Sequence, residues 1–418
     1  MKTIRLPFRL KPFALSLMFS LLPSAFSLVC SAATHLVGAN QSIQSVIDGA
    51  ASGDTIVLTA PIDYPGHLAI TGKALHIKGL SDQTTVTGNL SISAVPANGK
   101  VTLRNCKVVG NVDANGSSLD LLRCTVEGIV TLPDKQDPTS NDIQLTVLQS
   151  NLREKLVSKA ARSWIAYSTL EQTYFENKVE IVGNVFDGRS FGGIGIDLNG
   201  TATDASIHNN QIYNFSMSAN HNISNTCIGI RVDGGAKAVI RNNRISDNRD
   251  TNHEYSETWV GIGVWVKSTT GTRIEGNVMW NNYVPYGGTD GQGNCQVYAP
   301  AENVVMRNNA FDGEGLVQPR GGVAIGEYIE SKDGNWGSFL VDPAGLMNGK
   351  PGKNKGPPEV IYNDLDGSRN DIGPNGGRNY IPNGRTTNKP IPISFTASPI
   401  AVPVGGVITI ESTGATAK

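Results

Sequence analysis

A short motif recurs five times between residues 179 and 313, and this repeat limits the folds that the chain can adopt. Each copy places an asparagine beside apolar residues, and the five asparagines are Asn184, Asn210, Asn243, Asn277 and Asn309. Their numbers differ by 26, 33, 34 and 32 residues. Self-similarity at a period of roughly 20–50 residues is typical of a solenoid, in which each unit packs only on its neighbours.

The repeating unit is built from strands. Apolar residues alternate with others at Ile194, Ile196 and Leu198, and again at Ile262, Val264 and Val266, which is the period of a β-strand. Glycine and asparagine occur where the chain must turn. Short strands, tight turns and an asparagine before each new strand predict the coils of a right-handed parallel β-helix, an all-β solenoid.

The repeated asparagines have a physical reason in such a fold. Asparagine tolerates the left-handed backbone region that sharp turns require, and its amide can hydrogen-bond to a neighbour. Coils of a parallel β-helix are about 4.8 Å apart, so equivalent amides are close enough to bond along the axis. We therefore expect the five asparagines to occupy turns and to form an amide ladder.

Composition narrows the functional classes. The chain has 418 residues, a formal net charge of −1 and only 6% aromatic residues, with 47 glycines. Few aromatics and many glycines fit a solenoid whose core is valine and isoleucine. A near-neutral charge removes any general argument for nucleic-acid binding, which needs a basic surface.

The amino terminus predicts export. Residues 1–33 have a positive start at Lys2 and Arg5, an apolar stretch from Phe13 to Leu22, and small residues at Ser31 to Ala33. This is the pattern of a secretory signal peptide. No other apolar run is long enough for a membrane span. We expect a secreted protein (periplasmic, extracellular or at the cell surface) that is a monomer.

Two cysteines occupy similar contexts. Cys106 and Cys124 each follow a leucine-rich strand and are 18 residues apart, an interval that suits neighbouring coils. Equivalent positions on adjacent coils lie within disulfide range, but parallel side chains make poor disulfide geometry. The sequence leaves both a disulfide and a stack of buried thiols open.

The mature amino terminus resembles a known class of proteins. Ser42-Ile43-Gln44 opens a short amphipathic helix, Gly53-Asp54-Thr55-Ile56 leads into a strand, and Tyr64, Leu68 and Ile70 follow at strand spacing. This pattern is similar to the amino-terminal cap and first coils of secreted bacterial β-helix proteins of the pectin-lyase-like superfamily. The resemblance implies a short helix that covers the open end of the solenoid. The superfamily includes lyases, hydrolases, epimerases and adhesins, so it implies an architecture and no single activity.

The pattern divides the chain into four parts: a signal peptide (1–33), the β-helix with its cap (34–347), a loop-rich closing segment (348–390) and a β-rich tail (391–418). Coils between Leu75 and Tyr174 are less regular than the later ones. The tail resembles the opening strands of an immunoglobulin-like module, either as a stub or paired with the solenoid.

The closing segment contains acidic residues at alternate positions, Asp364 and Asp366, with Asp371 shortly after. It is similar to an Asp-x-Asp-Gly element that closes many secreted bacterial β-helix proteins. Alternate acids followed by glycine resemble the first part of a Ca²⁺ loop, although the distal glutamate is missing. Two interpretations stay open, a structural Ca²⁺ site and a polar closing turn.

Aligning the strongest coils predicts two outward rows of side chains. One row contains Asp197, Arg231, Trp265 and Gln296, and the next contains Asn199, Asp233, Lys267 and Tyr298. An aromatic ring can stack on a sugar, a cation can pair with a uronate carboxylate, and an aspartate can accept hydroxyl hydrogen bonds. Flanking loops that carry His253, Trp259 and Tyr283 are expected to wall the same cleft. The alternative is that these residues are polar only because they face water.

These rows favour a protein that binds an acidic polysaccharide and raise the question of cleavage by β-elimination. A lyase needs a base beside a uronate and a cation, and the resemblance implies Arg231 or Lys267 as base with Ca²⁺ held by carboxylates. The closely grouped carboxylates of such a site are not evident in the sequence. The alternative function is a non-catalytic structural or adhesive solenoid.

Overall fold

The computed structural model describes residues 32–81, 83–133, 143–189, 192–216, 226–249, 260–282, 295–299, 304–311, 316–318, 352–378, 380–398 and 409–416. The predicted signal peptide, apart from its last two residues, lies outside this set. No helix in the described part of the chain is long and apolar enough to cross a membrane.

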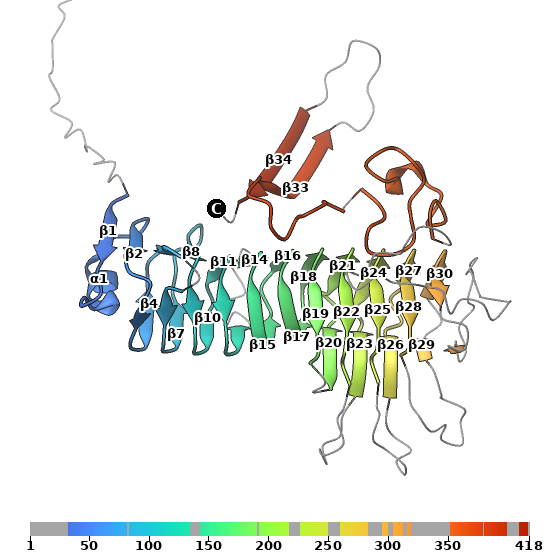
Figure 1. Ribbon diagram of the computed structural model, residues 1–418, viewed down its shortest axis with the longest axis horizontal. Helices are drawn as coiled ribbons and strands as arrows, with labels where there is room; N and C mark the ends of the chain where they lie inside the picture. The colour runs from blue at the N-terminus through green and yellow to red at the C-terminus, as the bar shows by residue number, and fades with distance from the viewer. Residues whose placement is uncertain are drawn as a thin grey trace, which may run out of the picture. The chain divides into compact units, whose positions relative to one another are not determined.

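Parallel strands from successive coils form three ladders, and each coil contributes in turn to the first, second and third (Figure 1). The first ladder contains β1 (Thr34–Val37), β2 (Thr55–Leu58), β5 (His76–Gly79), β8 (Lys100–Arg104), β11 (Ser118–Leu122), β14 (Gln144–Leu148), β16 (Arg162–Ala166), β18 (Lys178–Val182), β21 (Asp204–His208), β24 (Lys237–Arg241), β27 (Thr272–Glu275) and β30 (Val304–Arg307). Each of its strands pairs in parallel with the strand of the next coil.

The second ladder contains β3 (Asp63–Tyr64), β6 (Thr85–Val86), β9 (Lys107–Val108), β12 (Thr125–Val126), β19 (Val185–Asp187), β22 (Gln211–Tyr213), β25 (Arg244–Ser246), β28 (Val278–Trp280) and β31 (Ala310–Phe311). The third contains β4 (Leu68–Thr71), β7 (Leu90–Ser93), β10 (Val112–Asn115), β13 (Val130–Leu132), β20 (Gly193–Leu198), β23 (Thr226–Val232), β26 (Val260–Val266), β29 (Cys295–Tyr298) and β32 (Leu316–Gln318). Two long strands, β15 (Asn151–Ser158) and β17 (Thr169–Phe175), belong to both of these ladders. The predicted right-handed parallel β-helix is thereby confirmed.

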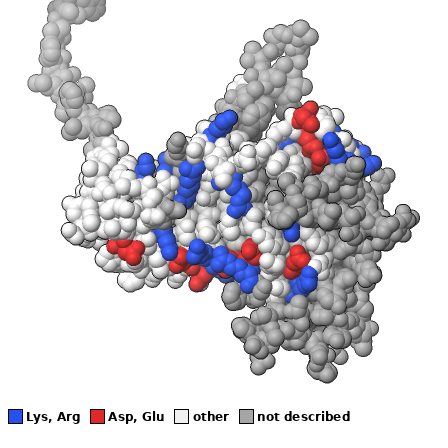
Figure 2. Space-filling model, in the orientation of Figure 1, with Lys and Arg blue, Asp and Glu red and all other residues white. Residues whose placement is uncertain are grey.

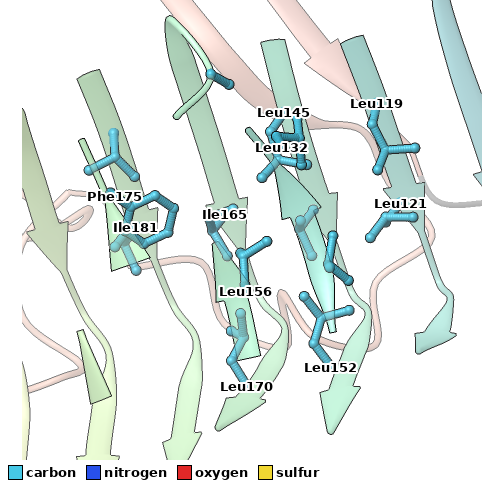
Figure 3. Packing of buried hydrophobic residues seen from close by; sticks show 14 of the residues in the cluster. Leu119, Leu121, Leu132, Leu145, Leu152, Leu156, Ile165, Leu170, Phe175 and Ile181 are labelled. Carbon is cyan, nitrogen blue, oxygen red and sulfur yellow. The ribbon is translucent and has the colours of Figure 1, made fainter. Parts of the chain in front are cut away.

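The core lies inside the coils and runs their whole length. Leu121 of the first ladder, Leu152 of the second and Leu156 of the third are buried, and their side chains point into the space that the ladders enclose (Figure 3). Alternate residues of each strand face inward, as β4 shows with buried Leu68 and Ile70 between exposed neighbours. Strand periodicity in the sequence thus becomes one continuous apolar interior.

The expected amide ladder is present and buried. The Nδ2 atom of Asn184 donates to Oδ1 of Asn210 at 3.0 Å, Asn210 donates to Asn243 at 2.9 Å, and the series continues through Asn277 to Asn309. The backbone N–H of each asparagine also donates to the Oδ1 atom of the next one along the axis. These amides therefore tie five successive coils together inside the protein.

The expectation that these asparagines adopt the left-handed region was wrong. The residue just before each of them has the positive φ, for example Asn209 at 57° and Asn242 at 54°. The left-handed residue turns the corner outward, and the next residue can then direct its amide into the core. One residue cannot do both, because a left-handed backbone directs its side chain away from the interior.

The coils between Leu75 and Tyr174, which the sequence predicted to be less regular, join the same three ladders, with one register shift where β15 pairs with β17. The interior ladder continues in them with smaller residues, since Ser168 and Ser150 accept backbone N–H bonds from the neighbouring coil where the asparagines do later. Cys124 and Cys106 follow at the next coils as free buried thiols, with their sulfur atoms 3.8 Å apart. Of the two alternatives, the structure has the thiol stack.

Helix α1 (Ile43–Gly49) lies at the amino-terminal end of the coils, beside β4 (Figure 1). Ser42 is its N-cap and accepts a hydrogen bond from the backbone of Ser45, while Ile43 and Ile47 are buried in the core. The side chain of Gln44 bonds the backbone of Ala69 in both directions. The helix stands where the resemblance places a cap.

The closing segment returns along the outside of the coils and contains one short 3₁₀ helix among its described residues, η2 (Val360–Tyr362). It leads to an antiparallel hairpin of β33 (Ile391–Ser398) and β34 (Thr409–Ala415). Ile391 at the base of the hairpin packs with Trp164 and Tyr167 of the solenoid. The tail is therefore attached to the coils.

Candidate functional site

The third ladder brings together most of the predicted site. Asp197 of β20 pairs with Arg231 of β23, Arg231 pairs with Trp265 of β26, and Trp265 pairs with Tyr298 of β29. Tyr174 of β17 precedes Asp197 in the same row. Asp233 and Lys267 follow the paired strands and continue the backbone bonding from coil to coil. We call Tyr174, Asp197, Arg231, Asp233, Trp265, Lys267 and Tyr298 the polar wall.

The last coil corrects the predicted register by two residues. Val297 pairs with Val264, so Tyr298 lies beside Trp265, where the sequence alignment had placed Gln296. Gln296 is buried, and its Oε1 atom accepts a 2.5 Å hydrogen bond from Asn282. It belongs to a second interior amide series that joins Phe215, Asn248 and Asn282. A polar residue between apolar ones is no proof of an outward position when an interior ladder needs amides.

Asp197 and Arg231 form a two-point ion pair. The Nε and Nη2 atoms of Arg231 donate to the two carboxylate oxygens of Asp197 at 2.8 and 2.6 Å. Asp197 is only 8% exposed, so the pair is held in a partly dry environment where such bonds are strong. The hydrogen bonds that Arg231 donates to Asp197 raise the pKa of Arg231. Arg231 therefore keeps its proton.

The two aromatic residues of the wall are in contact. The ring centroids of Trp265 and Tyr298 are 5.8 Å apart with an interplanar angle of 64°, an edge-to-face pair. The Nζ atom of Lys267 lies 4.1 Å from the centroid of the Trp265 ring. Both rings are half-buried, and Lys267 is exposed. A cation over an indole face next to a second ring makes a surface that is apolar and positive together.

Three strands of the polar wall, β20, β23 and β26, each contain a glycine at the same position. Gly195, Gly229 and Gly263 stand at equivalent positions, and a Cβ atom on Gly195 would lie 2.7 Å from the ring of Phe215. Because these glycines let the interior residues approach the backbone, the strict alternation that the sequence predicted stops there. Ile194, Ile228 and Ile262 consequently join Trp265 and Tyr298 in a small cluster separate from the main core.

Tyr174 connects the wall to neighbouring charges. Its hydroxyl donates to Glu176 at 2.5 Å, and Glu176 pairs with Lys159 at 3.0 Å. Burial, together with the adjacent carboxylate of Glu176, raises the pKa of Tyr174 to about 12. The phenol therefore stays protonated. The sequence analysis did not select Tyr174, whose one signal is its place in the row before Asp197.

The remaining predicted residues are placed as follows. Asp233 accepts a 2.8 Å hydrogen bond from the backbone of Gly234. His253, Trp259 and Tyr283 lie outside the described residues. Surface charge elsewhere is mixed: Glu127 pairs with both Lys107 and Arg153, and Figure 2 shows charges of both signs side by side on the face in view.

The three acids of the closing segment accept hydrogen bonds from their own segment. Asp364 bonds the backbone N–H of Gly377, Asp366 bonds Ser368, and Asp371 bonds the backbone N–H of Asn354. No cluster of three or more His, Cys, Asp or Glu within the described ranges has the arrangement of a metal site. The geometry is that of a polar turn, and the Ca²⁺ site stays a prediction.

Comparison with solved structures finds similar folds. No protein-family model matches the chain, and no curated protein matches its sequence. A solved structure, the crystal structure of pectate lyase Pel9A, aligns over 82% of this chain and 96% of that chain, with 13% identity and a TM-score of 0.45. This similarity is too low to carry an argument about activity. The stacked parallel ladders establish the expected parallel β-helix architecture, and the likeness to the pectin-lyase-like superfamily stays a resemblance.

Proposed function

We propose that the polar wall binds an acidic polysaccharide. The observation that carries the proposal is the half-buried Trp265 ring, which has the Lys267 cation over its face and Arg231 on the preceding coil. An indole face suits the apolar face of a pyranose, and the neighbouring cations suit its carboxylate or sulfate. Because the coils repeat at about 4.8 Å, successive side chains of the wall can meet successive parts of one extended chain.

Lys267 is the cation that this proposal assigns to the acidic group. It is exposed and forms no ion pair with a described carboxylate. Arg231 differs, because Asp197 already takes two of its N–H groups. We therefore expect Lys267 to contribute most of the preference for charged over neutral chains, while Arg231 and Asp197 keep the wall in shape.

Cleavage by β-elimination is not part of the proposal for Arg231. A base must release its own proton first, and the Asp197 hydrogen bonds raise the pKa of Arg231, in the unfavourable direction. Lys267 is the remaining candidate base from the sequence. Incubation with pectate, alginate or a glycosaminoglycan in the presence of Ca²⁺ tests it, since a lyase releases unsaturated products that absorb in the ultraviolet.

Direct binding measurements test the proposal. Affinity electrophoresis or calorimetry with pectate, alginate, a glycosaminoglycan and a neutral glucan should show binding to at least one acidic chain. Lys267→Gln and Trp265→Ala should each weaken it about tenfold, the effect of one charge-assisted contact or one stacked ring. Lys237→Gln, which changes an exposed lysine on the first ladder, is the matched control and should leave the affinity unchanged.

The second candidate is a non-catalytic structural or adhesive solenoid. It is favoured by contacts within the polar wall, because Asp197 and Arg231 form an ion pair and Trp265 and Tyr298 pack together. No binding to any acidic chain, or equal binding by the Lys267→Gln and Lys237→Gln variants, would leave this candidate in place of the first.

A further inference from the structure

One corner of the solenoid places large side chains at left-handed backbone positions. Between the first and second ladders, each coil from residue 105 to residue 308 turns at one residue of positive φ, namely Asn105, Arg123, Gln149, Tyr167, Gly183, Asn209, Asn242, Gly276 and Asn308. Glycine adopts this conformation freely, whereas arginine, glutamine and tyrosine adopt it at a cost in free energy. Those side chains must therefore gain interactions that offset the cost.

The gain comes from the main chain of the closing segment. Asn308 donates to the carbonyl of Lys355 at 3.1 Å, and Asn242 donates to the carbonyl of Asp371 at 2.6 Å. The same pattern holds at the earlier corners, where Asn209 donates to Pro374 and Gly376, Gln149 to Gly384 and Thr387, and Arg123 to Thr387. The direction is reversed at Tyr167, whose hydroxyl oxygen accepts a hydrogen bond from the backbone N–H of Ile381. We call these six side chains the corner row and residues 352–378 and 380–391 the strap.

The side chains of the strap also complement the side chains of the first ladder that they cover. Its later part, with Ile381 and Ile391, covers the apolar side chains of Leu122, Leu148, Trp164, Ala166 and Val182. Its earlier part faces charges, where Tyr362 lies 3.7 Å from the Arg241 guanidinium and Glu359 pairs with Arg307. Side chains therefore set the position of the strap, while the corner row holds its backbone.

We infer that the corner row is a binding site for a polypeptide segment rich in turns, and that the strap is its ligand within this chain. The ligand is recognised mainly through its carbonyl groups, from Lys355 at one end to Thr387 at the other, and it runs opposite to the order of the coils. A segment that is held by so many separate contacts does not depend on the peptide bonds that connect it to the last coil. The strap is thus an intramolecular ligand that non-covalent contacts are sufficient to hold on the coils.

Cutting the connection in the folded protein tests this inference. A protease recognition sequence placed between Gln318 and Gly352 of the full chain allows cleavage after folding, followed by size-exclusion chromatography. We expect the fragment that begins near Gly352 to elute with the solenoid. Its release from the unmodified corner on cleavage would overturn the inference.

Glycine variants test the donors themselves. Asn209→Gly with Asn242→Gly keeps the left-handed backbone, as Gly183 and Gly276 do at equivalent corners, and removes only the amides. We expect the cleaved fragment to leave at least about tenfold faster. Asn105→Gly is the matched control, because it makes the same change at a corner with no hydrogen bond to the strap among the described residues, and retention should be unchanged.

Two further measurements keep the outcome clear. Circular dichroism of the uncut chains shows whether the double variant folds, and Gln149→Gly replaces it if it does not. Hydrogen exchange on the uncut chains should rise at residues 371–387 in the donor variants and stay constant in Asn105→Gly. Equal retention and equal exchange in all variants would show that the corner row does not hold the strap.

Discussion

Side chains hydrogen-bond neighbouring coils together in both the early and the late part of the solenoid. These bonds are exposed to water in the early coils and buried in the core in the late coils. In the early coils, the backbone N–H of Asn89 donates to His67, that of Asn111 donates to Asn89, and that of Ile129 donates to Asn111, all on exposed turns. In the late coils, bonds of the same kind lie at the corner between the first and second ladders and run through buried amides, from Asn184 to Asn309. The chemistry is shared, and the surroundings differ.

This difference determines how much each ladder contributes to stability. Water replaces a lost hydrogen bond on an exposed turn, so removal of the side chain costs little. Inside the coils no water replaces it, and the partners left behind remain unsatisfied. The exposed ladder of the early coils is therefore expected to tolerate changes of its residues that the buried ladder of the late coils does not.

The largest effect is expected for Asn243→Ala. This change removes the acceptor of both the backbone N–H and the side-chain amide of Asn210, and the donor to Asn277. Because all of these groups are buried, we expect a loss of about 4–5 kcal/mol in the free energy of unfolding, measured by urea denaturation. A loss below about 1 kcal/mol would mean that the interior ladder is incidental to stability.

His208 sharpens the comparison through pH. Its ring is buried beside Ser206, Arg241 and Glu275, and burial, followed by the charge of Arg241, lowers its pKa from 6.5 to about 3. The unfolded chain binds a proton below pH 6.5 and the folded chain does not, so stability falls as the pH decreases from 6.5 toward 3. The expected contribution is roughly 3 kcal/mol between pH 7 and pH 4.

The measurement is the difference between the parent chain and His208→Gln in urea denaturation at both pH values. Carboxylates titrate in both proteins and cancel in this difference. An identical pH dependence in the parent and the His208 variant would contradict the prediction.

Gly88→Ala tests whether the early coils are tolerant everywhere. A Cβ atom on Gly88 would lie 2.2 Å from the backbone oxygen of Gly66 and 2.8 Å from the backbone nitrogen of His67. Backbone atoms of the adjacent coil cannot yield as a side chain can, so we expect a loss of about 2 kcal/mol in the free energy of unfolding. Gly49→Ala, where a Cβ atom would meet nothing within 4 Å, is the control. Equal melting temperatures of the two variants would contradict the prediction.

The sequence predicted the late coils better than the early ones for a physical reason. Five copies of the same residue, asparagine, are visible in the sequence as a repeat. The same position is taken in the earlier coils by two residue types, serine at Ser150 and Ser168 and cysteine at Cys106 and Cys124, and this mixture hides the repeat. The exposed turns repeat glycine followed by histidine or asparagine at Gly66, Gly88 and Gly110, a pattern ordinary enough to resemble any loop.

The site was predicted in part for a similar reason. Equal strand spacing correctly placed Asp197, Arg231 and Trp265 side by side. It failed at Gln296. Alternation shows which residues share a face, and a polar residue was assigned to the outer face, but the interior amide series places the polar Gln296 on the inner face. The closing segment at 348–390 was predicted, but its contacts with the corner row were not. Its contacts join residues 47 to 265 positions apart, from Asn308 with Lys355 to Arg123 with Asn388, and such distant pairs leave no local pattern.

The smallest effect is expected for Asn111→Ala, and it tests the comparison most directly. Asn111 donates its backbone N–H to Asn89 and accepts that of Ile129 at 2.9 Å with its side chain, the role that Asn243 has toward Asn210. The bond to Ile129 is exposed, so water can satisfy the freed N–H group. We expect a loss below about 1 kcal/mol in the free energy of unfolding, against 4–5 for Asn243→Ala in the same urea series. Equal losses would show that the number of hydrogen bonds, and not their burial, decides how firmly neighbouring coils are held.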